Sequence, residues 1–135
     1  QQFCQPKLNP KFLKKVLKAR PNKRVQRIGC TDSSDGLFQA LKDLSFESNC
    51  KAIIDYKKIP KYSNWPKGDE WEQYYFFGGE DYELVFSLPK RWAKNLLNSD
   101  KDISEIGYFT EGSPSVEFEN LKNDKLLKYK SFSHF

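Results

Sequence analysis

The sequence predicts an α+β (α/β layered) fold, a mixed β-sheet covered by helices. Apolar residues at helical spacing alternate along the chain with short, strand-like runs. The last strand-like runs are joined by short turns, as in hairpins, and this pattern favours a mixed sheet over a doubly wound one. The chain of 135 residues can bury one core and is too short for two ordinary domains. We therefore expect a single domain.

The first expected element is a helix that starts at Asn9 and Pro10. Asparagine is a common N-cap, and proline is common at the first helical position. Pro21 is expected to end this helix. Four apolar side chains at helical spacing should form its buried face: Phe12, Leu13, Val16 and Leu17.

The next expected elements lead to a short buried strand. Residues 24–30 (RVQRIGC) fit either a strand or a helical end, and the pattern leaves both open. A second helix should run from Leu37 to about Ser48, because its apolar residues recur at helical spacing. The run KAIID, Lys51–Asp55, then predicts the buried strand.

The second half of the chain repeats this alternation. Residues 59–68 predict a loop interrupted by prolines, residues 70–77 a short aromatic helix, and residues 82–88 a strand with one strongly buried face. A third long helix should run from Pro89 to about Asn98, with Trp92, Ala93 and Leu96 facing inward. Three further strands are expected at residues 103–108, 115–118 and 125–129.

Composition favours a soluble protein of the cytoplasm. Hydrophobic residues make up 38% of the chain, yet no apolar stretch approaches the roughly 20 residues that cross a bilayer. The cysteines lie far apart and form no CxxC pair, so we expect reduced thiols: Cys4, Cys30 and Cys50. The net charge is +5, and residues 1–31 carry many lysines and arginines but no acid. Because the chain starts at Gln1 and lacks methionine, we expect a fragment.

The stretch TDSSDGL, residues 31–37, is the most informative one for function. Asp32 and Asp35 stand before the expected start of a helix, where backbone N–H groups attract anions. Two carboxylates would repel a bare phosphate unless a divalent cation lay between them, and Mg²⁺ commonly binds one or two carboxylates together with phosphate oxygens. An Asp or Ser N-cap with a spare surface acid explains the same residues, and such caps are common.

The stretch GGEDYELVF, residues 78–86, raises the same choice. Gly78 and Gly79 can adopt positive φ, which would leave Glu80 and Asp81 at the mouth of the next strand. Glycine pairs often mark a plain turn, so this stretch alone favours a turn. Because both acidic junctions adjoin predicted sheet elements, they could converge on one cleft.

The sequence contains no signature of nucleophilic catalysis. It lacks a Ser/His/Asp arrangement, a GxxxxGK[ST] phosphate loop and the kinase HRD and DFG motifs. Its single histidine, His134, lies in an aromatic tail, where a structural role is the expected one.

At these motifs the sequence resembles the C-terminal half of the thiamine-monophosphate kinases, in the superfamily that includes aminoimidazole ribonucleotide synthetase. The family motif DISDGL is matched by Asp32–Leu37, and GGEDYELLF by Gly78–Phe86, which differs only at Val85. Three weaker matches keep the same order: Ser48–Pro60 to SGVGAxID...LP, Ile106–Gly112 to IGxVTEG, and Ser131–Phe135 to GWDHF or GYDHF. Coverage runs from about Arg24 to Phe135.

The resemblance implies a direct, Mg²⁺-assisted transfer of the γ-phosphoryl group of ATP to thiamine monophosphate, giving thiamine diphosphate. Carried over by position, Asp32 and Asp35 would be magnesium ligands and Ser34 an ATP contact. Glu80 would contact the thiamine phosphate, and Phe132 would stack on or flank its rings.

Departures from the family motifs limit what is carried over. Ser33 replaces an apolar residue, Asn49 and Cys50 replace Gly-Val, and Ser133 replaces an aspartate. The first two are expected to affect packing more than ligands. The resemblance also implies an N-terminal domain, absent from this sequence, with further magnesium aspartates, much of the ATP site and the interface of a homodimer. The segment alone should be inactive.

Two other functions stay open at this point. One is a different ATP-dependent enzyme of the aminoimidazole ribonucleotide synthetase superfamily. The other is a basic nucleic-acid-binding module built on residues 7–27. Against the second, the basic residues are not interleaved with the aromatics that single-strand platforms use. We expect no nucleic-acid partner and no membrane partner.

Overall fold

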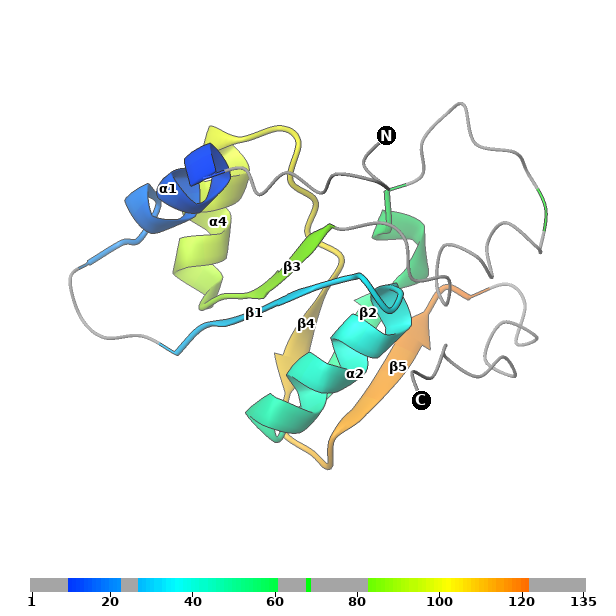
Figure 1. The fold of residues 1–135 in the computed structure, drawn as a ribbon. Coiled ribbons are helices and arrows are strands. Elements are labelled where there is room, and N and C mark those ends of the chain that lie inside the picture. Colours follow the sequence, from blue (N-terminus) through cyan, green and yellow to red (C-terminus); the bar gives the residue numbers. More distant parts are fainter. Residues whose placement is uncertain (1–9, 23–26, 61–67, 69–82, 122–135) are drawn as a thin grey trace.

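The structure, a computed structural model, describes residues 10–22, 27–60, 68 and 83–121. Helices and strands alternate along these residues (Figure 1). The elements are α1 (Pro10–Lys18), β1 (Gly29–Asp32), α2 (Leu37–Ser48), β2 (Lys51–Asp55), the 3-10 helix η1 (Tyr56–Lys58), β3 (Leu84–Ser87), α4 (Lys90–Ser99), β4 (Gly107–Thr110) and β5 (Ser115–Glu119).

The strands form two small sheets. β1 pairs with β3 antiparallel, and a second sheet has the order β4-β2-β5, in which β2 is antiparallel to β4 and parallel to β5. The prediction of a mixed sheet covered by helices is confirmed. The hairpin expectation is wrong for β4 and β5, because β2 lies between them. β2 has three consecutive buried residues, Ala52, Ile53 and Ile54, and such a run is best buried at the centre of a sheet.

One apolar cluster lies between α2 and the three-stranded sheet (Figure 1). Its buried members are Leu37, Leu41, Ala52, Ile54 and Ile59. Phe38 stacks on Phe118 at the edge of this cluster, with ring centroids 6.0 Å apart. The buried Ser45 hydroxyl is within hydrogen-bond distance of the carbonyl oxygens of Cys50 (2.6 Å) and Ser115 (3.0 Å). It therefore ties the end of α2 to the beginnings of β2 and β5.

A second cluster joins α1 to α4, which lie side by side in Figure 1. Val16, Trp92 and Leu96 are each only 2% exposed. The indole Nε1–H of Trp92 donates to the Val16 carbonyl oxygen at 2.7 Å. The polar atom of this large aromatic side chain is thus satisfied within the core.

The buried face of α1 differs from the predicted one. Phe12 and Val16 pack inward, but Leu13 is 41% exposed and Leu17 is 61% exposed. Val16 packs with Trp92 and Leu96 of α4, while the Phe12 ring lies 5.6 Å from that of Phe86 in β3, and neither contact covers Leu13 or Leu17. The helix ends at Lys18, three residues before Pro21, and its start at Pro10 agrees with the prediction.

Strand β3 separates the two clusters. Phe86 packs with the α1–α4 cluster, whereas the adjacent Val85 packs with the α2 cluster. The expectation of a single strongly buried face is therefore wrong. Successive side chains of a strand point to opposite faces, and here each face meets a different core.

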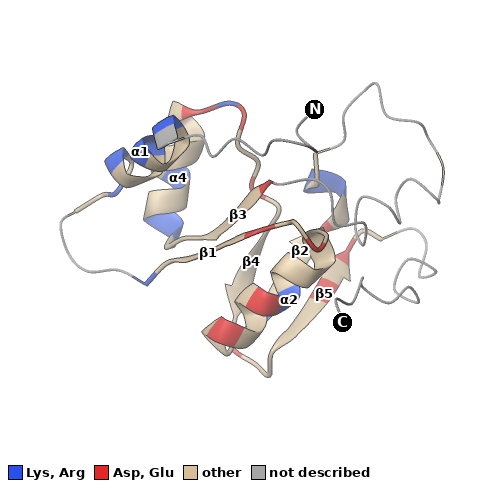
Figure 2. Ribbon diagram, in the orientation of Figure 1, with Lys and Arg blue, Asp and Glu red and all other residues tan. Residues whose placement is uncertain are grey.

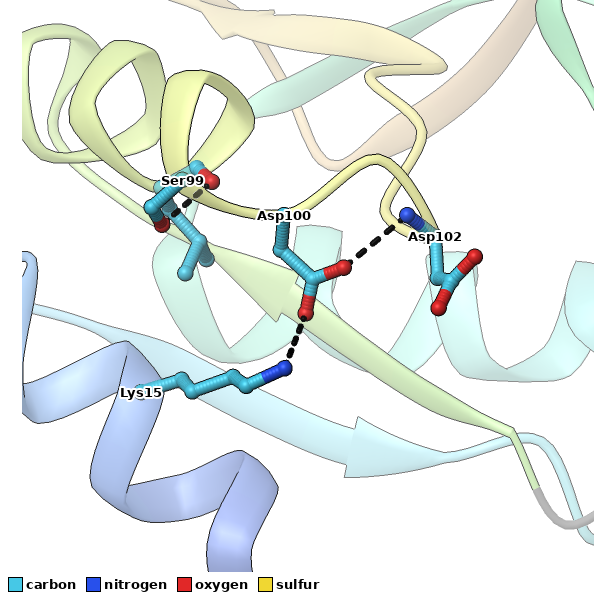
Figure 3. Close-up of polar contacts among 5 residues, drawn as sticks. Lys15, Ser99, Asp100 and Asp102 are labelled. Atoms are coloured by element: carbon cyan, nitrogen blue, oxygen red, sulfur yellow. Dashed lines mark hydrogen bonds and ion pairs between the residues drawn. The ribbon is translucent and has the colours of Figure 1, made fainter.

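Charge on α1 and α4 is mostly positive and exposed (Figure 2). One of these cations is paired: Lys15 Nζ lies 3.2 Å from Asp100 Oδ2, at the end of α4 (Figure 3). The Asp100 side chain is only 8% exposed, and its other oxygen accepts the Asp102 N–H at 2.9 Å. The pair links the two helices where their shared core ends.

The strand predicted at residues 103–108 is wrong in its bounds, because β4 runs from Gly107 to Thr110. Most of the other element predictions are confirmed or untested. The bounds of α2 and β2 match the prediction, and α4 agrees within a residue at each end. In the stretch 24–30, residues 24–26 lie outside the described residues, residues 27 and 28 belong to no helix or strand, and β1 begins at Gly29. The helix at 70–77 and the strand at 125–129 lie outside the described residues. Within the part of the chain that is described, no helix has the length and apolar character to cross a membrane.

Candidate functional site

The first of the two predicted acidic junctions, Asp32–Asp35, lies at one end of the β1–β3 pair, and β3 belongs to the stretch that carries the second. The acids of the second junction, Glu80 and Asp81, lie outside the described residues. Asp32, the last residue of β1, is opposite Leu84, the first residue of β3. Beyond this pair the contact continues, because the Ser33 N–H donates to the Glu83 carbonyl oxygen at 2.9 Å. Residues 31–33 thus pair with residues 83–85. Convergence of the two acidic junctions stays a prediction, because residues 78–81 lie outside the described residues.

The connection from β1 to α2 is a tight turn. Asp32 Oδ1 accepts the Ser34 N–H at 3.0 Å, and the Gly36 N–H donates to the Ser33 carbonyl at 2.9 Å. Gly36 is the N-cap of α2, with φ 92° and ψ 156°, a conformation essentially restricted to glycine. The alternative explanation of an Asp or Ser N-cap is therefore wrong: neither acid occupies the cap position, and Asp32 closes the turn before it.

The electrostatics of this turn favour a charged Asp32. The Ser34 hydroxyl, followed by the Ser34 N–H, lowers the pKa of Asp32 against the opposing effect of partial desolvation. Cys30 lies two residues earlier on β1. The pKa of its thiol is raised, chiefly by burial and then by the negative charge of Asp32. Asp32 itself is exposed and Asp35 is half-buried, so solvent or a ligand can reach both.

Ser33 is the residue of this site that sequence reasoning assigned to packing. It is 4% exposed, and its Oγ accepts the Glu83 N–H at 3.1 Å. Together with the Ser33 N–H bond to the Glu83 carbonyl, this makes a reciprocal pair of contacts between the two stretches. The sequence did hold one sign of this role, because Ser33 places a hydroxyl at a motif position that is usually apolar.

A further acid lies at the same end of the α2 layer. α2 and β2 are joined by Asn49 and Cys50 alone and run in opposite directions, so the end of β2 lies near the beginning of α2 (Figure 1). There Asp55 accepts the Asn120 side-chain amide at 3.0 Å and the Lys57 N–H at 3.1 Å. The Asn120 contact is the first cause of the lowered pKa of Asp55. Asp55 therefore organises the ends of β2 and β5.

Three of the five predicted site residues share the β1–α2 turn: Asp32, Ser34 and Asp35. Glu80 and Phe132 lie outside the described residues, as does His134. In the sequence, Glu80 is three positions before Glu83, the residue bonded to Ser33.

The donor chemistry of the turn suits a hard cation that is shared with a ligand. Asp32 and Asp35 supply carboxylate oxygens, and the first N–H groups of α2 face the same region and favour anions. The described residues contain no group of three His, Cys, Asp or Glu side chains that could hold a metal by themselves. Mg²⁺ needs no such group, since it usually binds one or two carboxylates and completes its shell with water and phosphate.

The known proteins that this chain resembles belong to one family. Residues 2–119 match the family described as "AIR synthase related protein, C-terminal domain". The chain is 38% identical over 125 residues to the thiamine-monophosphate kinase of Prochlorococcus marinus, covering 93% of this chain and 38% of that protein. It is 40% identical over 111 residues to the thiamine-monophosphate kinase of Aquifex aeolicus, covering 77% of this chain and 33% of that protein.

A solved structure agrees. The crystal structure of the thiamine-monophosphate kinase from Stenotrophomonas maltophilia superposes with a TM-score of 0.56 and 28% identity, covering 67% of this chain and 31% of that one. The chain thus spans about a third of the length of the relatives it matches.

Proposed function

Because the chain belongs to the AIR synthase related proteins, matching their C-terminal domain, we propose that it is the C-terminal domain of a thiamine-monophosphate kinase. The reaction is the transfer of the γ-phosphoryl group of ATP to thiamine monophosphate, giving thiamine diphosphate. One structural observation carries this proposal: the β1–α2 turn with Asp32 and Asp35 is bonded directly to the chain leading from the Glu80 stretch. Metal-nucleotide chemistry and substrate recognition could therefore meet there.

In this proposal Asp32 and Asp35 hold Mg²⁺, and Ser34 contacts ATP. When bound, Mg²⁺ would neutralise phosphate charge, which phosphoryl transfer requires more than it requires a protein nucleophile. The chain's own contribution is placement. The Ser34 hydroxyl, and then the Ser34 N–H, lower the pKa of Asp32, and Gly36 turns the backbone into the first turn of α2.

The proposal extends to parts of the protein outside the described residues. Glu80 is assigned to the thiamine phosphate and Phe132 to its rings. A separate N-terminal domain would supply further magnesium ligands, much of the ATP site and the interface of a homodimer. We place the enzyme in the cytoplasm, as the sequence predicts.

The direct test uses the full-length protein that contains this chain, with ATP, Mg²⁺ and thiamine monophosphate. Phosphorus NMR should show thiamine diphosphate and ADP appearing together in equal amounts. Asp35→Asn should lower kcat by about 10²–10³-fold, the usual effect of removing one preorganised charge at a reacting phosphate. ATP consumption without formation of thiamine diphosphate would contradict the proposal and favour another ATP-dependent member of the superfamily.

A further inference from the structure

The buried Ser33 hydroxyl connects two stretches that sequence reasoning treated as separate. Ser33 is 4% exposed, and its Oγ accepts the Glu83 N–H at 3.1 Å while its N–H donates to the Glu83 carbonyl at 2.9 Å. Just before these contacts, Asp32 and Leu84 are partners in the β1–β3 register. Where the β1–β3 register ends, Glu83 is therefore held to the acidic turn by one backbone bond and one bond to the Ser33 side chain.

We propose that Ser33 is a positioning residue, whose hydroxyl fixes Glu83 and the beginning of β3 against the Asp32–Asp35 turn. This inference rests on the proposed function, which assigns the turn to Mg²⁺ and ATP and the chain that precedes Glu83 to the thiamine phosphate.

The two sides of this link are held unequally. The turn has its own anchors, which are the Ser34 N–H bond to Asp32 and the Gly36 N–H bond to the Ser33 carbonyl. None of these bonds uses the Ser33 hydroxyl, so all of them persist in Ser33→Ala. Among the hydrogen bonds that span from the turn to Glu83, the variant removes the one to the Glu83 N–H. The beginning of β3 should therefore loosen while the acidic turn keeps its shape.

This asymmetry gives a kinetic signature. In the full-length protein, Ser33→Ala should raise the KM for thiamine monophosphate about three- to tenfold, the usual consequence of losing one hydrogen bond. The KM for ATP should stay within about twofold of its original value. Ser33→Thr keeps the hydroxyl and should restore the KM for thiamine monophosphate. If both KM values stayed unchanged, or rose together, the inference would be wrong.

Ser45 provides a matched control. It is also buried, at 1% exposed, and its hydroxyl also joins separate elements, but it lies at the far end of α2 from the acidic turn. Ser45→Ala should lower the unfolding midpoint and leave both KM values within about twofold. A rise in the KM for thiamine monophosphate equal to that of Ser33→Ala would show general loosening and overturn the proposal.

A second measurement does not depend on the reaction. Hydrogen exchange of the Glu83 amide should become about tenfold faster in Ser33→Ala than in Ser45→Ala, since only the first variant removes its acceptor. Equal exchange rates of the Glu83 amide in the two variants would overturn the proposed role of Ser33. This test does not need Ser33→Thr, so it stays decisive if that variant does not fold. If the unaltered protein did not phosphorylate thiamine monophosphate, the proposed function would fail, and this exchange rate would still decide whether Ser33 holds β3.

Discussion

Two aspartates of this chain form the same local turn and have opposite surroundings. Asp32 accepts the N–H of Ser34 at 3.0 Å, and Asp100 accepts the N–H of Asp102 at 2.9 Å, each two residues further along. The Asp100 side chain is 8% exposed and is paired with Lys15 from another helix. Asp32 is exposed, and no cation of the described residues is paired with it.

This difference separates a structural acid from one available to a ligand. A lysine already balances the charge of Asp100, and the pair holds two helices together (Figure 3). Asp32 shares its turn with a second acid, Asp35, next to the beginning of α2. Mg²⁺ commonly binds one or two carboxylates, so the same turn motif serves the fold in one place and a proposed metal site in the other.

The largest effect is expected in the α1–α4 region. Trp92→Ala should lower the free energy of unfolding by about 3–5 kcal/mol, because it opens a cavity and removes the donor to the Val16 carbonyl. Denaturant unfolding measures this loss. If the α1–α4 region serves the fold alone, the KM values of the folded full-length variant should not change. A large change in KM would show that this region also contributes to substrate binding, which contradicts the contrast drawn with the acidic turn.

A smaller effect is expected at the acidic turn. Gly36→Ala should cost about 1–3 kcal/mol of stability, because φ 92° and ψ 156° are strained for any residue with a side chain. It should also lower kcat, since the strain is relieved by moving Asp35. Gly112→Ala is the control, because Gly112 also has a positive φ, 147°, but lies in the β4–β5 connection. The control should lose stability and keep kcat, so equal losses of kcat would count against a site at the turn.

The smallest effect is a dependence on pH. The Asp102 N–H first, and then Lys15, lower the pKa of Asp100 in the folded state. A lowered carboxylate pKa adds stability above the ordinary aspartate value of about 3.9, and this stability is lost as the pH falls through the folded value. The stability difference between the unaltered chain and Asp100→Asn should therefore be present at pH 6 and shrink below about pH 4. A difference independent of pH would show that the charge of Asp100 is not what holds α1 to α4.

Much of the fold could be predicted because local patterns specify it. The helical spacing of apolar residues predicted α2, and the short apolar run in KAIID predicted β2. The buried face of α1 could not be predicted, because whether Leu13 and Leu17 are covered depends on which helix packs there. The place of β2 between β4 and β5 is likewise a long-range pairing that no turn signal encodes.

The site could be predicted in part for the same reason. Asp32, Ser34 and Asp35 are close in sequence, so their shared turn is specified by a local motif. The link from Ser33 to Glu83 joins residues 50 positions apart, and only the pairing of β1 with β3 reveals it. A serine within an apolar motif position was a signal, but its partner could not be read from the sequence.

The most direct test of the difference between the Asp32–Asp35 turn and the paired Asp100 is Mn²⁺ binding to the full-length protein in the presence of ATP, measured by electron paramagnetic resonance. We expect Asp35→Asn to weaken Mn²⁺ binding by at least about tenfold, because it removes a metal ligand. Asp100→Asn should leave the affinity within about twofold, since Lys15 already balances that carboxylate. Unchanged Mn²⁺ affinity in Asp35→Asn, or an equal loss in both variants, would contradict the assignment of the Asp32–Asp35 turn to the metal.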